Sequence, residues 1–155
     1  MPMPIEIIPI GWVRGGRTEP IDDQWDQVRC EIVLDAAQFT PDALAGLDAF
    51  SHLEVLFHFD QVGIDEITTA ARHPRGRTDW PKVGIFAQRG KNRPNRLGIS
   101  VCKLVAVEGL VITVEGLDAI HGSPILDIKP VMKGFLPRGE VHQPDWADEI
   151  MAEYW

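Results

Sequence analysis

The positive charge of this chain is concentrated in one segment that could bind an anion. Nine of the fifteen Lys and Arg residues lie between positions 72 and 103, where Asp79 is the only acid, although the formal net charge of the 155-residue chain is -8. Segregated charge of this kind favours a site for an anionic ligand. The Gly, Pro and Asn content of residues 84–98 predicts a shaped loop rather than a solvated helix.

The loop from Arg89 to Arg96 is the best candidate for the anion site. Guanidinium groups are planar and pair with carboxylate or phosphate, and Pro94 stiffens the turn that holds Asn95. Arginines in a tight loop can instead bind only the backbone, and this structural role is the alternative. A second basic loop contains Arg75 and Arg77 and is followed by Trp80, which suits RNA phosphates and a stacked base. A solvated loop explains this second pattern equally well.

Carboxylates stand at three other places. Asp22 and Asp23 belong to an acidic loop that either faces a cation or ribose hydroxyls, or is simply solvated. Asp118 follows a predicted strand, where its carboxylate could accept a hydrogen bond from a ribose or an amino group. Asp127 and Lys129 are two residues apart, on one face of a strand, and form either a structural ion pair or a substrate clamp.

Several classes of protein lose support from missing patterns. The chain has no G-x-G-x-x-G, no P-loop, no G-x-S-x-G and no C-x-x-C, which disfavours Rossmann cofactor sites and common hydrolases. Its five His residues are scattered and predict no metal site, and Cys30 and Cys102 read as buried free thiols. No apolar run reaches the roughly 20 residues of a membrane span, and the N-terminus does not resemble a signal peptide. We therefore expect a cytoplasmic protein with no membrane contact.

Period-2 patterning dominates the chain and predicts a mainly β protein, a β-barrel or a β-sandwich, with one short helix and an irregular C-terminal tail. We expect one domain of 155 residues, with the barrel over about 5–130 and an extension over 131–155. Glu108 and Gly109 predict a hairpin turn, and Thr40-Pro41 predicts the start of a short helix. The tail over 146–155 favours a short amphipathic helix, packed on the barrel or contacting a partner. The predicted strands cover residues 5–13, 28–34, 52–59, 82–87, 97–107, 110–117 and 123–128.

Three motifs, in order, resemble the TsaA-like, or TrmO, family. They are F-S-H-L-E-V-L-F-H-F-D (50–60), G-I-F-A-Q-R-x-x-x-R-P-N-R (84–96) and G-L-D-A-I-H-G-S-P-I-L-D-I-K-P (116–130). Members methylate N6 of threonylcarbamoyladenosine at position 37 of tRNA with S-adenosylmethionine. The resemblance is to a short barrel-only form of the family. It implies a single β-barrel, S-adenosylmethionine as the cofactor and tRNA as the partner. It also implies a homodimer with the cofactor in a cleft near the subunit interface.

The resemblance also implies roles for individual residues. Arg89 is expected to hold the methionine carboxylate, and Asn95 or Asp118 to accept the hydrogen of N6. Two alternatives stay open: a methyltransferase with a non-tRNA substrate, and a non-catalytic barrel that binds a nucleotide or RNA. The implied cofactor residues are Asp22, Asp23, Gln24, Asp60, Gln61, Arg89, Ile99, Glu115, Gly116, Leu117 and Asp118. The residues expected to bind the RNA are Arg75, Arg77, Arg93, Arg96 and Lys129.

Overall fold

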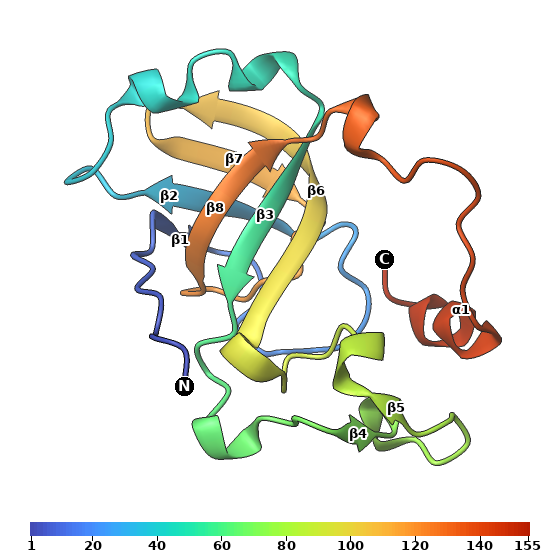
Figure 1. The fold of residues 1–155 in the computed structure, drawn as a ribbon. Helices are drawn as coiled ribbons and strands as arrows, with labels where there is room; N and C mark the ends of the chain where they lie inside the picture. The colour runs from blue at the N-terminus through green and yellow to red at the C-terminus, as the bar shows by residue number, and fades with distance from the viewer.

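Six antiparallel strands close into a barrel (Figure 1). The computed structural model describes all residues from 1 to 155. Around the barrel the strand order is β1-β2-β7-β6-β3-β8, so no strand of the barrel is left as an edge. The mainly β prediction is confirmed. The barrel strands are β1 Gly11–Arg14, β2 Arg29–Leu34, β3 His52–His58, β6 Leu97–Glu108, β7 Val111–Glu115 and β8 Pro124–Pro130.

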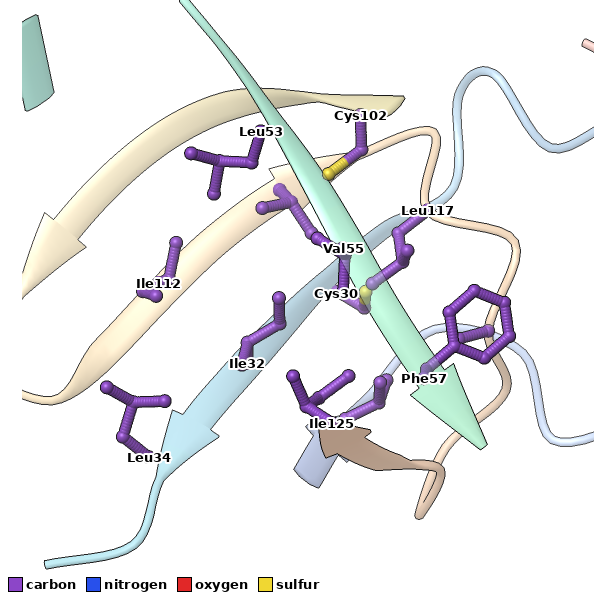
Figure 2. Close-up of a cluster of buried hydrophobic side chains, with 13 residues drawn as sticks. Cys30, Ile32, Leu34, Leu53, Val55, Phe57, Cys102, Ile112, Leu117 and Ile125 are labelled. Carbon is purple, nitrogen blue, oxygen red and sulfur yellow. The ribbon is translucent and has the colours of Figure 1, made fainter. Parts of the chain in front are cut away.

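Alternation along the strands builds the core inside the barrel (Figure 2). In β3 the side chains of Leu53, Val55 and Phe57 are buried, whereas the residues between them are not. Cys30 and Cys102 are free and buried, as predicted. Burial, with a smaller effect from neighbouring charge, raises the pKa of Cys30 to about 11 and that of Cys102 to about 12. Both thiols are therefore packing residues rather than nucleophiles.

The hairpin prediction is confirmed, whereas two strand predictions were too long. Glu108 pairs with Val111 across the β6–β7 turn, and Gly109 supplies the left-handed backbone there with φ 62°. The strand predicted over 5–13 begins only at Gly11, although the Ile10 amide donates to the carbonyl of Ile125 at 2.8 Å. Residues 1–8 are exposed and belong to no strand, so their apolar alternation does not extend the barrel.

The strand predicted over 82–87 is wrong beyond Gly84. β5 (Val83–Gly84) pairs only with β4 (Ala71–Arg72), outside the barrel, and a 3₁₀ turn follows at Ile85–Ala87. Ile85 is buried, and the buried Gln88 side chain donates to the carbonyls of Arg72 and Val83. Local packing of this two-stranded unit therefore overrides the strand pattern. We call residues 60–96 the basic lobe; it projects from the end of β3 (Figure 1).

The helices are short. The helix predicted after Thr40 is a 3₁₀ helix, Pro41–Leu44, which follows an extended Thr40. The chain end forms α1 (Asp145–Met151), four residues shorter at its end than the predicted 146–155 segment. Helix α1 lies outside the barrel, on the side of the basic lobe (Figure 1). No helix has the length and apolar content that crossing a membrane requires. The other 3₁₀ helices are Leu47–Ala49, Ile64–Glu66, Pro74–Gly76, Pro94–Arg96 and Lys133–Phe135.

Candidate functional site

Three segments that are distant in sequence meet beside the barrel end where β2 begins and β7 ends. The amide of Gln24 donates to the carbonyl of Glu153 at 2.9 Å, and the amide of Trp25 donates to the carbonyl of Tyr154 at 2.8 Å. The Gln24 side chain adds a bond to the Glu153 carbonyl at 3.0 Å. These contacts hold the chain end against the acidic loop. The loop is therefore packed against other residues and is not only solvated.

Asp118 lies at the centre of this meeting point. Gly116, with φ 79°, turns the chain out of β7, and Leu117 and Ala119 point into the core. The half-buried Asp118 lies between these two buried residues. The buried Ser100 hydroxyl donates to one carboxylate oxygen, and the Tyr154 hydroxyl donates to the other. Two donors fix the orientation of the carboxylate, and each oxygen keeps a lone pair for a ligand.

The basic lobe contacts the same cluster through two side chains. The Arg75 guanidinium binds both carboxylate oxygens of Asp23, at 3.0 and 3.3 Å, and its side chain is 24% exposed. The indole of Trp80, buried in the lobe, donates to the Glu149 carboxylate on α1. A bidentate pair of this kind is directional as well as ionic. The lobe, the acidic loop and the chain end thus form one connected surface.

The charges of two guanidinium groups affect the pKa of Tyr154 at this cluster. Burial and the adjacent Asp118 carboxylate hold the pKa of Tyr154 far above its ordinary value, whereas the charges of Arg89 and Arg75 lower it slightly. Arg89 also donates to the carbonyl of Ile99, next to Ser100, and Arg75 binds Asp23, so these contacts hold both guanidinium groups beside the cluster. Of the four implied cofactor regions, the structure brings together the acidic loop, Arg89 and the turn at 116–118.

An open cavity of about 470 Å³ lies next to this cluster. Its volume falls within the 300–1,000 Å³ typical of small-molecule sites. Two of the residues that line this cavity, Glu115 and Gly116, belong to the implied cofactor set. Glu115 also forms an ion pair with Arg29. A smaller hollow of about 80 Å³ on the outer barrel face includes Ile99 and Lys129. The larger cavity is lined by Asp26, Gln27, His52, Val101, Cys102, Lys103, Glu115, Gly116 and Trp155.

The arginines of the 89–96 loop bind backbone carbonyls. Arg89 donates to the carbonyl of Ile99, Arg93 to that of Gln88 and Arg96 to that of Val62, each at 2.6 Å. This is the structural role that the sequence left open. A guanidinium has five N–H groups, so one bond still leaves donors for a ligand.

The remaining predicted site residues lie apart from the Asp118 cluster. Asp60 and Gln61 are exposed beyond β3 and form no hydrogen bond with the cluster. Asn95 is exposed in a left-handed backbone with φ 62°. Arg77 forms an ion pair with Asp79, and Lys129 pairs with Asp127 at 3.0 Å on the outer barrel surface. Their predicted roles stay predictions.

Sequence reasoning missed three residues of the site: Ser100, Tyr154 and Trp155. Ser100 occupies an inward position of β6, where alternation predicts packing rather than a polar contact. Tyr154 and Trp155 belong to the 146–155 tail, whose pattern predicted only a short amphipathic helix. Their two rings meet edge to face with centroids 4.8 Å apart. No group of three or more His, Cys, Asp or Glu side chains is arranged to hold a metal ion.

The fold and the site together define a closed antiparallel barrel with a polar cluster at one end. The chain belongs to the family described as the tRNA-methyltransferase O N-terminal domain, whose model matches residues 17–135. The residues from 136 onward lie outside the matched range, although they contribute Tyr154 to the site.

Known proteins resemble this chain in sequence and in structure. It is 38% identical over 102 residues to a human tRNA (adenine(37)-N6)-methyltransferase, covering 66% of this chain and 23% of the relative. It is 30% identical over 144 residues to a probable S-adenosyl-L-methionine-binding protein of Pyrococcus abyssi, covering 91% and 76%. The crystal structure of TrmO from Pseudomonas aeruginosa superimposes with a TM-score of 0.72 at 27% identity, covering 90% of this chain and 62% of that one. The chain spans only 21–23% of the length of its human, rat and mouse relatives.

Proposed function

We propose that this protein is a methyltransferase that uses S-adenosylmethionine to methylate N6 of an adenosine in tRNA, the threonylcarbamoyladenosine at position 37. The observation that carries the proposal is the polar cluster at Asp118, formed where the resemblance implies cofactor residues. The names of the human and Pyrococcus abyssi relatives support the reaction and the cofactor respectively. The proposed tRNA substrate supports a cytoplasmic location.

The residues present fit the cofactor. Its adenosine part needs an apolar or aromatic wall and acceptors for ribose hydroxyls, and the 470 Å³ cavity offers Trp155 beside the carboxylates of Asp26 and Glu115. Its methionine part carries a carboxylate, which suits the remaining N–H groups of Arg89. When bound, the cofactor supplies an electrophilic methyl group on its sulfonium.

The protein itself has to orient the reacting groups and accept one proton. As N6 gains a methyl group it loses its hydrogen as a proton. In this proposal the fixed Asp118 carboxylate accepts the hydrogen bond from that N–H and passes the proton toward solvent. Asn95 is the alternative acceptor, and in this proposal the basic lobe binds the RNA backbone.

A methyltransferase acting on another acceptor is the second candidate, because the arginines expected to bind RNA are already occupied. Arg75 binds Asp23, Arg77 binds Asp79, and the loop arginines bind carbonyls. With the net charge of -8, this leaves less free positive charge for phosphates. Methyl transfer to modified tRNA, compared with a small nucleoside acceptor, separates the two candidates.

Replacing Arg89 by Ala is expected to weaken binding of S-adenosylmethionine by about 10-fold or more, because hydrogen bonds between charged groups contribute roughly 1.5–3 kcal/mol. Isothermal titration calorimetry on the wild type and the variant measures this. Arg77→Ala is the matched control, since Arg77 lies in the same lobe but pairs with Asp79. Unchanged binding by the Arg89 variant, with reduced RNA binding, would reverse the proposed roles. A folded wild type that does not bind the cofactor would refute the proposed function.

We also propose that the protein forms a homodimer, as the resemblance implies. The outer face of β6 supports this, because Ile99, Val101 and Val105 are 44%, 49% and 38% exposed on a face that is usually polar. Sedimentation velocity is expected to give twice the 17.3 kDa chain mass. Val101→Asp is expected to shift the protein toward the monomer, and a wild-type monomer at micromolar concentration contradicts the proposal.

A further inference from the structure

The chain end contacts the site from two sides, although it lies outside the part of the chain that matches the family. We propose that Tyr154 is a positioning residue that holds Asp118 in the orientation needed to bind the ligand. The inference rests on the proposed function, since it deepens the role of Asp118 there. It adds Tyr154, near the chain end, to the site.

The backbone that carries Tyr154 is held in place independently of Asp118. Upstream, Glu149 accepts the hydrogen bond from the Trp80 indole. Next to Tyr154, Glu153 and Tyr154 itself accept backbone hydrogen bonds from Gln24 and Trp25. The chain end is thus anchored at two points, and the phenol projects from a fixed backbone toward the carboxylate.

The contact to Asp118 is one of a matched pair. Ser100 donates to one oxygen from inside the barrel, and Tyr154 donates to the other from outside. With both donors present, rotation of the carboxylate breaks two charge-assisted bonds. With Tyr154 removed, the carboxylate has one donor and can rotate. The raised pKa of Tyr154 keeps the phenol protonated, so it acts as a donor and not as a base.

Tyr154→Phe tests the inference, because it removes only the hydroxyl and keeps the ring. We expect the dissociation constant for S-adenosylmethionine, measured by calorimetry, to rise about 10-fold. Glu149→Ala is the matched control: it cuts the other anchor of the chain end without touching Asp118, and we expect less than about a 2-fold change. Thermal melting confirms that each variant is folded.

The outcomes separate the inference from the proposed function. Cofactor binding by the wild type with no change in Tyr154→Phe overturns the inference alone. An equal loss in both variants also overturns it, because the effect then comes from undocking of the chain end. Absence of cofactor binding by the wild type overturns the proposed function itself.

A second readout needs no ligand. Tyr154 is the only tyrosine, so ultraviolet absorbance titration reports on it alone. The charges facing the phenol are Asp118, Arg89 and Arg75. We expect no phenolate signal at the ordinary pKa of about 10 in the folded wild type, and a lower pKa in Asp118→Asn. Ordinary ionisation near pH 10 in the folded wild type overturns the Tyr154–Asp118 contact.

The same contact links stability to pH with a defined sign. The pKa of Tyr154 is raised in the folded state, so the unfolded chain ionises first as the pH increases. The contribution to stability is therefore complete below the unfolded pKa of about 10 and is lost as the pH rises above it. Tyr154→Phe is expected to remove this alkaline loss.

Discussion

Replacing Asp118 by Asn is expected to reduce the rate of methyl transfer to tRNA by roughly 100-fold, the lower range for losing a positioned proton acceptor. Asparagine has nearly the same shape, and its amide oxygen can accept one of the two hydrogen bonds, while its NH2 group can only donate to the other hydroxyl oxygen. What it loses is the charge that takes up the proton released from N6. A single-turnover assay with saturating S-adenosylmethionine measures the chemical step, separated from cofactor binding.

The matched control for this prediction is Asp35→Asn. Asp35 accepts hydrogen bonds from Ala37 and Gln38 in a turn after β2, away from the Asp118 cluster, and the amide oxygen of asparagine can keep one of them. We expect the control to keep the wild-type rate. A wild-type rate in Asp118→Asn would show that Asp118 does not accept the proton, and would leave Asn95 as the remaining candidate.

Replacing Phe57 by Ala is expected to lower the free energy of unfolding by about 3–5 kcal/mol, the range for deleting a buried aromatic side chain. Phe57 is 2% exposed and packs edge to face against Phe59 at 5.2 Å. It also lies against Gly98, where an added Cβ would come within 2.5 Å of its ring. Because residue 98 is glycine, it has no side chain that could fill the cavity left by the deleted ring.

Urea denaturation followed by fluorescence measures this change. Phe86→Ala is the matched control, because Phe86 is 79% exposed and its loss is expected to change the free energy by less than about 0.5 kcal/mol. Similar losses in the two variants would contradict the assignment of Phe57 to the barrel core.

The strands could be predicted from the amino-acid sequence, because alternation is a local property. Cys30, Ile32 and Leu34 repeat every second residue, and a strand with this period has one face to bury whatever its neighbours are. The turn at Glu108-Gly109 was readable for the same reason, since glycine permits the left-handed backbone. The three motifs also identified the family, and with it the regions around Asp118 and Arg89.

Which side chains of the site contact one another depends on the tertiary structure. Tyr154 reaches Asp118 across 36 residues, and Ser100 reaches it across 18, so neither contact leaves a local pattern. The arginines of the 89–96 loop show the same limit. Their charge was evident from the sequence, but whether each guanidinium faces a carbonyl or a ligand depends on how the loop packs against β6 and residue Val62. Composition predicts that a charge is present, whereas the fold decides what that charge contacts.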